Sequence, residues 1–198
     1  MIDLLKSHTG FDPKNVENPS NIRNLYVGHN NLTHIDLSKF TNLESLDIGH
    51  NNIEEISYLP KTLKWLCIAD NPIKNYDSVY ELKNLEYLWA HQSDIDITEC
   101  YKLKNLNQLL VDDCRNISDI SVVKNFENLS MLELKNNNVT DISCLKNKKL
   151  YFLNLLNNNV FDIDVLSGMG TLRKLNIKDN PIQNYTALKT LNLYRLQV

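Results

Sequence analysis

The sequence predicts an α/β repeat fold, a solenoid in which each coil contributes one short β-strand. An apolar pattern, Leu-x-x-Leu-x-Leu-x-x-Asn-x-Ile, recurs from near the start of the chain to near its end. Successive copies lie 20 to 23 residues apart, since they begin at Ile22, Leu43, Leu63, Leu85, Leu106, Leu129, Leu150 and Leu172. A solenoid of such repeats spreads a single core along its axis and does not divide it into domains.

Each copy contains a strand followed by a turn. In the copy that starts at Leu43, Leu46 and Ile48 alternate with polar or small residues, which is the two-residue period of a strand with one buried face. An asparagine follows where the chain must turn, and its buried amide can bond backbone groups that the turn leaves unpaired. These asparagines should stack as an Asn ladder formed by Asn30, Asn51, Asn71, Asn137, Asn158 and Asn180.

The second half of each copy carries apolar residues three apart, as in Ile53, Ile56 and Leu59. The segments are too short for long helices, so we expect 3₁₀ turns or irregular coil.

The pattern and its period resemble the leucine-rich repeat family, and the resemblance extends from about Asn21 to the C-terminus. It implies a right-handed horseshoe with a concave parallel β-sheet and a convex side of 3₁₀ turns and coil. The repeat length is similar to the short, 22-residue class, which includes a protein phosphatase-1 regulatory subunit and the bacterial internalins. Membership of that class implies protein binding by repeats that are not catalytic.

The chain divides into a short start and a long array. Residues 1–20 do not match the repeat, and Ile2, Leu4, Leu5 and Phe11 could cap the first coil. Residues 21–198 hold eight repeats and a partial terminal strand of uncertain register. No C-terminal cap is obvious, so the last strand is a tolerated edge, pairs with something, or belongs to a longer protein. We expect a monomer unless that edge pairs.

Composition indicates one soluble, cytoplasmic domain. The 198 residues are 42% hydrophobic, carry a net charge of −3, and begin without the apolar run of a signal peptide or membrane span. Four scattered cysteines favour reduced thiols, although sequons such as Asn31-Leu-Thr33 point weakly to secretion. Because the basic residues are dispersed and the total is acidic, we expect neither nucleic-acid nor membrane binding.

Function should lie in the outward-facing strand positions, because the fold explains the others. These positions hold both tryptophans and predict a nearly continuous apolar band of Trp65, Tyr87, Trp89, Leu110, Met131, Phe152 and Leu156. With His91 and Asp112 at its edge, the band is our candidate partner-binding surface. Alternatively, some of these side chains pack on one another or under the N-terminal segment. Gly28, Gly49 and Ala69 lie beside the band and could let a partner approach the backbone.

Charge is unevenly distributed along the chain. Residues 1–100 carry 8 basic and 15 acidic side chains, whereas residues 101–198 carry 13 and 9. A partner of reverse polarity would be oriented by this field, or the asymmetry is drift among solvated residues.

Other chemistry finds little support. His29 and His50 occupy the same place in adjacent repeats and could share a metal with Asp47, although polar surface filling is the commoner explanation. Asp112, Asp113 and His91 suggest an acid–base group near Trp89. No nucleophile motif, phosphate loop or ligand spacing accompanies them, so we predict no enzyme, no metal and no cofactor.

Two functions remain open. One is a cytosolic interaction module whose concave face binds a protein, as a regulatory or scaffolding subunit of an enzyme such as a phosphatase. The other is an internalin-like bacterial adhesin or delivered effector that binds a host protein. We also expect a local bulge or change of curvature where Ser93 and Cys114 replace ladder asparagines.

Overall fold

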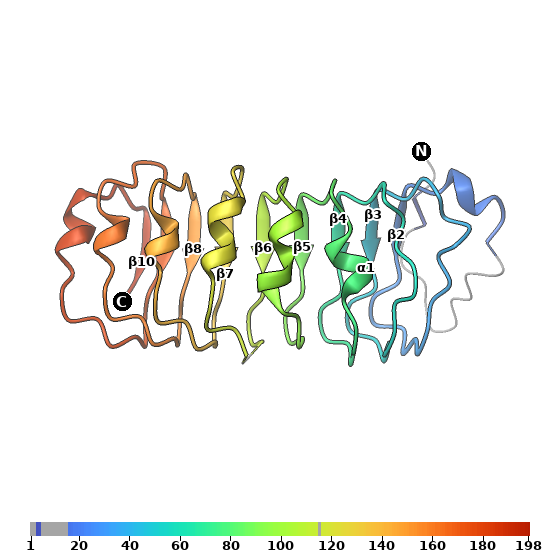
Figure 1. The fold of residues 1–198 in the computed structure, drawn as a ribbon, viewed down its shortest axis with the longest axis horizontal. Helices are drawn as coiled ribbons and strands as arrows, with labels where there is room; N and C mark the ends of the chain where they lie inside the picture. Colours follow the sequence, from blue (N-terminus) through green and yellow to red (C-terminus); the bar gives the residue numbers. More distant parts are fainter. Residues whose placement is uncertain (1–2, 5–15, 115) are drawn as a thin grey trace.

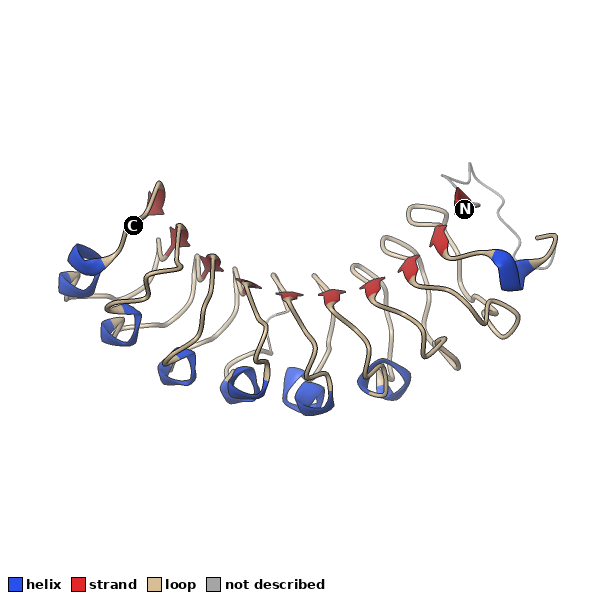
Figure 2. Cartoon of the chain, turned by 90° about the horizontal axis from the view of Figure 1, so that it is seen from above, coloured by secondary structure: helices blue, strands red, loops and turns tan. Residues whose placement is uncertain are grey.

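A computed structural model describes residues 3–4, 16–114 and 116–198 of the chain. The described chain forms an elongated, curved solenoid (Figure 1). Seen from above, the strands line the inside of the arc and most of the short helical turns line the outside (Figure 2). The predicted horseshoe with a concave sheet is therefore confirmed.

The strands form one parallel, open sheet in which they follow one another in chain order. Its ten strands within the described residues are β1 (Asp3–Leu4), β2 (Asn24–Tyr26), β3 (Ser45–Asp47), β4 (Trp65–Cys67), β5 (Tyr87–Trp89), β6 (Gln108–Leu110), β7 (Met131–Glu133), β8 (Phe152–Asn154), β9 (Lys174–Asn176) and β10 (Arg195–Gln197).

The register of the sheet superposes equivalent repeat positions. The central residue of each strand from β2 to β9 is a leucine that pairs with the central leucine of the next strand, as Leu66 does with Leu88. These leucines are at most 1% exposed. Because side chains alternate across a strand, burying the central leucine directs its two neighbours to the concave face.

A sharp turn follows every strand from β2 to β9. The residue before each ladder position has a positive φ, between 50° and 59°, at His29, His50, Asp70, Gln92, Asp113, Asn136, Asn157 and Asp179. Left-handed backbone is costly for most side chains, but Asn, Asp and His tolerate it best. The turn therefore explains why these residue types recur here.

The Asn ladder joins neighbouring coils as predicted. Asn158 Nδ2 donates to the carbonyl oxygens of Leu134, Leu155 and Leu156, and its Oδ1 accepts from the Val139 amide at 3.0 Å. Asn30, Asn51, Asn71, Asn137 and Asn158 are buried, whereas Asn180 is half-buried. Each amide thus replaces water for backbone groups inside the coil.

The convex side consists of short turns, as expected. They are α1 (Asp77–Tyr80) and the 3₁₀ helices η3 (Ile97–Lys102), η4 (Ser121–Asn125), η5 (Ser143–Leu145), η6 (Asp164–Leu166) and η7 (Thr186–Thr190), while η2 (Pro19–Asn21) precedes the first repeat strand. At each convex turn, the side-chain oxygen of an Asp or Asn accepts a hydrogen bond from the backbone amide two residues later in the chain. Asp119 does so from the Ser121 amide at 2.7 Å. This capping by Asx turns was not predicted, although its Asp-x-Ser spacing is visible in the sequence.

The irregular middle leaves the sheet intact. The registers of β5, β6 and β7 continue without a break, and in the sequence the extra residue falls between Cys114 and Ile117. The Asn116 amide donates to the Cys114 carbonyl oxygen. In other repeats the amide two residues after the ladder position donates to the next ladder asparagine. As a result, Asn137 Oδ1 is buried and has no hydrogen-bond donor among the described residues. The strands themselves therefore carry no bulge, Arg115 lies outside the described residues, and a change of curvature stays a prediction.

The two ends of the array also have definite positions. Leu196 pairs with Leu175, which settles the register of the last strand and makes Leu193 the equivalent of Leu172. At the other end β1 adds a strand beside β2, which the sequence did not predict. The proposed cap lies outside the described residues at Ile2, Leu5 and Phe11, and for Leu4 only the backbone pairing is described.

Candidate functional site

The outward strand positions meet on the concave face, as the sequence predicted. Trp65, Tyr87, Trp89, His91, Asp112, Met131, Phe152 and Leu156 are all partly exposed. Leu110 corrects the prediction, because its side chain is only 7% exposed. It lies in register between Trp89 and Glu133. The apolar band is therefore interrupted at β6.

Three aromatic rings form a connected cluster on the N-terminal half of this face. The rings of Trp65 and Trp89 meet edge to face with centroids 4.9 Å apart, and Tyr26 contacts Trp65 in the same way at 6.1 Å. Tyr26 was not among the predicted site residues, although its outward position in β2 could have indicated it. Such contacts fix the orientation of rings that remain partly open to solvent. We call Tyr26, Trp65 and Trp89 the aromatic cluster.

A carboxylate pair lies next to the aromatic cluster. Burial raises the pKa of Asp112 to about 6 and also raises the pKa of Glu133 on the neighbouring strand. Asp112 Oδ1 accepts from the Lys135 backbone amide at 2.7 Å, and the Asp112 amide donates to His91 Nδ1 at 3.2 Å. Burial also lowers the pKa of His91, so its imidazole is neutral near pH 7. We call Asp112 and Glu133 the acidic pair.

Basic side chains gather at the other end of the same face. Lys174 on β9 lies beside Arg195 on β10 in the sheet register. The Lys174 ammonium lies 5.8 to 5.9 Å from the ring centroids of Tyr151, Phe152 and Tyr194. These rings hold the charge in place by cation–π attraction.

The space beside the glycines next to the aromatic cluster is already filled by other parts of the chain. A Cβ on Gly49 would lie 2.9 Å from Cys67 Sγ and 3.2 Å from Asp47 Oδ1. A Cβ on Gly28 would lie 3.0 Å from the Gly49 carbonyl oxygen. These glycines thus make room for neighbouring side chains and backbone, and the direct approach of a partner to the backbone remains untested.

The other predicted chemistry gains no support. His29 and His50 stack with their ring centroids 4.2 Å apart, and His50 Nδ1 lies 3.0 Å from Asp70. Among the described residues no three His, Cys, Asp or Glu side chains are placed to hold a metal ion. Burial raises the pKa of the Cys67 and Cys100 thiols to about 12, which leaves them poor nucleophiles.

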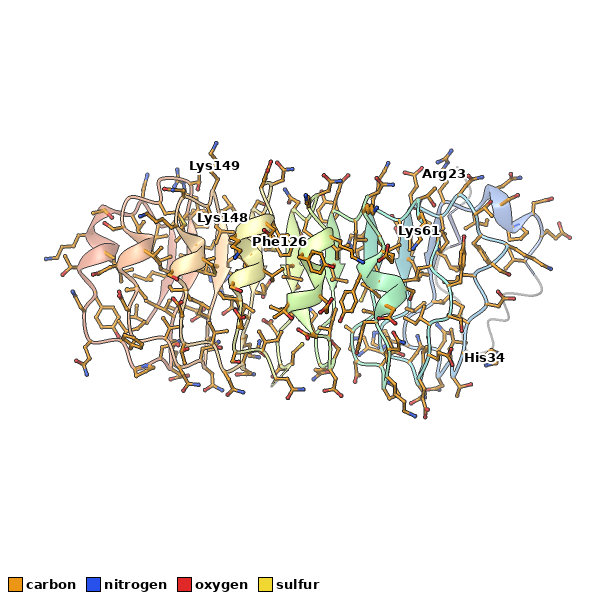
Figure 3. All side chains as sticks on the ribbon, in the orientation of Figure 1. Arg23, His34, Lys61, Phe126, Lys148 and Lys149 are labelled. Atoms are coloured by element: carbon orange, nitrogen blue, oxygen red, sulfur yellow. The ribbon has the colours of Figure 1, made fainter. Side chains whose placement is uncertain are left out.

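The convex side differs in chemistry from the concave face. Figure 3 labels Lys148 and Lys149 near the buried Phe126, and Lys149 extends away from the coil. Lys148 instead turns inward, where its Nζ donates to the carbonyl oxygens of Phe126 and Lys124 at 2.8 and 3.0 Å. In the described chain, none of the helices has the length and apolar character needed to cross a membrane.

Comparison with known proteins identifies the class. A sequence model described as "Leucine Rich repeats (2 copies)" matches residues 20–61. The fold is similar to that of internalin C2 from Listeria monocytogenes, with a TM-score of 0.82 and 27% identity over 90% of this chain and 81% of that one. Internalin F from the same organism gives a TM-score of 0.82 and 26% identity over 90% of this chain and 56% of its own.

A more distant similarity shows the fold alone. A leucine-rich-repeat protein of Leptospira interrogans has a TM-score of 0.73 and 22% identity, and covers 88% of this chain and 49% of its own length. A comparison with curated proteins gives no match. The chain has the leucine-rich-repeat fold, and residues 20–61 match the sequence model of that family. Its solved neighbours include internalin-type repeat domains, and repeats of this family are generally non-enzymatic interaction modules.

Proposed function

We propose that this protein is an interaction module whose concave face binds a partner protein. The aromatic cluster is the observation that carries the proposal, since it places both tryptophans of the chain on the concave sheet face, where they are partly exposed. Exposed aromatic patches are typical of interaction sites, and tryptophan and tyrosine supply a large share of binding energy there. The core supports this division of roles, because Leu66 and Leu88 fill the inward positions of the same strands.

Selection from a random peptide display library tests the proposal. Pools selected on the wild-type protein should lose at least tenfold in affinity for Trp89→Ala, which corresponds to a loss of about 2 kcal/mol or more. They should bind Glu55→Ala, an exposed convex variant, as tightly as the wild type. Circular dichroism and thermal melting must show that both variants are folded. Equal binding by a folded Trp89→Ala variant would contradict the proposal.

Of the two cellular roles, the internalin-like one receives support from the comparisons. Two Listeria internalins match nine-tenths of this chain at 26 to 27% identity, whereas no finding favours a phosphatase subunit. The second proposal is therefore a bacterial adhesin or delivered effector that binds a host protein. Fractionation of the producing cells tests it, because a surface or culture-supernatant location supports this role and a strictly cytosolic one contradicts it.

The cytoplasmic location expected from the sequence also stays a proposal. The four cysteines are free and none is exposed, which supports a protein that folds in a reducing compartment. The same fractionation decides between the two locations.

A further inference from the structure

The concave face changes the sign of its charge along the solenoid. Outward positions on β3, β6 and β7 or just after them hold the acids Asp47, Asp112 and Glu133 and one base, Lys135. The corresponding positions at β9 and β10 hold the bases Lys174, Lys178 and Arg195. This charge reversal is a property of the face and not only of the two halves of the sequence.

The acidic pair forms no close ion pair with a basic side chain of the described chain, although the charge of Lys135 lies near enough to lower the pKa of Asp112. Among the described residues, no lysine or arginine nitrogen forms an ion pair with Asp112 or Glu133. The nearest ionisable nitrogen is His91 Nδ1, 3.8 Å from Asp112 Oδ2. That nitrogen accepts a hydrogen bond from the Asp112 amide, so it carries no proton to share. Two partly buried carboxylates side by side repel each other, and a cation between them would relieve that cost.

The aromatic cluster lies beside this unpaired charge. In the sheet register, Trp89, Leu110 and Glu133 occupy the same position on three consecutive strands. A lysine or arginine side chain that enters here meets a carboxylate on one side and an indole ring on the other. Aromatic faces attract such cations, and arginine also stacks on them.

The basic end provides the complementary contact. Lys174 is held by three aromatic rings and forms no ion pair with a carboxylate among the described residues. Lys174 and Arg195 are two to four strand spacings away from the acidic pair, which corresponds to roughly 10 to 19 Å. An extended peptide covers that distance with about three to six residues.

Building on the proposed function, we infer that the partner docks as a segment that crosses the strands and carries two charged blocks. Its lysine or arginine residues enter between Trp89 and the acidic pair, and its aspartate or glutamate residues lie over Lys174 and Arg195. The occupant is thus a polypeptide whose charge polarity is the reverse of the face that it covers.

Two synthetic peptides of identical composition test the inference. The first carries a lysine block and a glutamate block joined by a spacer of about four residues, and the second alternates lysine and glutamate. Because both tryptophans lie on the concave face, their intrinsic fluorescence reports binding. The block peptide should bind at least about tenfold more tightly, and the difference should shrink as salt is added. Equal affinities, or no binding by either peptide, would overturn the inference.

Charge-matched variants locate the binding determinants. Asp112→Asn with Glu133→Gln should weaken the block peptide at least fivefold, whereas Glu54→Gln with Glu55→Gln removes the same charge from the convex side and should change little. Lys174→Gln with Arg195→Gln should weaken it similarly, in contrast to Lys146→Gln with Lys149→Gln. If the convex pairs act as strongly, the effect is one of net charge and the inference fails.

The experiments distinguish a failure of this inference from a failure of the proposed function. A display pool that depends on Trp89 but shows no lysine or arginine enrichment would leave the concave binding face standing and refute the charge polarity. Conversely, a pool that is indifferent to Trp89→Ala would refute the binding face itself.

Discussion

The indole rings of Trp65 and Trp89 meet at an angle of 71° with centroids 4.9 Å apart. The two residues are 24 positions apart in sequence and lie on adjacent strands, so the contact exists only because the repeats stack. Each ring holds the other in a single orientation while part of its surface stays open. A rigid, partly exposed aromatic pair of this kind is suited to binding, because little side-chain entropy is lost when a partner arrives.

The first prediction compares the partly exposed Trp89 with the buried Leu88 beside it in β5. Leu88→Ala should lower the free energy of unfolding by about 3 kcal/mol, because it creates a cavity at a fully buried position. Trp89→Ala should lower it by about 2 kcal/mol or less, because part of the ring is already exposed and its buried Nε1–H has no partner to lose among the described residues. Urea titrations of both variants measure the difference. A larger loss for Trp89→Ala would mean that the residue belongs to the core and not to the face.

The second prediction concerns the Asn ladder. Asn158→Ala should cost about 1 to 3 kcal/mol, because it leaves buried backbone groups without partners. Asn137→Ala should lower the free energy of unfolding by about 1 kcal/mol less than Asn158→Ala does, because Asn137 Oδ1 accepts no hydrogen bond that the substitution could remove. Lys146→Ala at an exposed convex site should change stability by less than about 0.5 kcal/mol. Equal losses for the two asparagines in urea would contradict the broken hydrogen bond at Asn137.

A third prediction follows from the raised pKa of Asp112. Its carboxyl group titrates at about 6 when folded and near 4 when unfolded, so the folded chain binds the proton more tightly. The free energy of unfolding contributed by this group therefore falls as pH rises from about 4 to 6. Asp112→Asn removes this destabilisation and should stabilise the protein at pH 7.5 by about 1 to 3 kcal/mol, and far less at pH 4.

Thermal melts at the two pH values check this sign. His91, Asp113, Glu133 and Lys135 surround the carboxylate and remain in the variant. Because the charge of Asp112 also raises the pKa of Glu133, the difference between wild type and variant reports the acidic pair. The convex variant Glu55→Gln should show no such pH-dependent gain. A variant that is less stable than the wild type at pH 7.5 would mean that Asp112 stabilises the fold when charged.

The fourth prediction separates two adjacent lysines. Lys148 Nζ donates to two carbonyl oxygens at the end of η4, and burial lowers its pKa. Lys148→Ala should therefore cost about 1 kcal/mol, whereas Lys149→Ala, at an exposed site, should cost less than about 0.5 kcal/mol. Chemical denaturation distinguishes them, and indistinguishable midpoints would show that the inward hydrogen bonds of Lys148 contribute nothing.

The repeat pattern by itself determined most of the fold. The spacing of Leu46 and Ile48 within a copy identifies the strand, and the recurrence of the copies aligns equivalent residues across the sheet. Because the core of each coil packs mainly against the adjacent coils, local sequence is nearly sufficient to specify the architecture. The same reasoning located the outward positions and the Asn ladder. It could not assign the register at Leu196, where several leucines fit equally well.

The tertiary structure alone decided what the outward residues do together. Three features depend on distances between side chains of different repeats: the burial of Leu110, the contact between Trp65 and Trp89, and the absence of a close ion pair at Asp112 and Glu133 in the described chain. A repeat pattern specifies which residues share a face, because direction alternates along a strand. How far each side chain is desolvated, and therefore its pKa, depends on the volumes of neighbours some twenty residues away, which no local pattern contains.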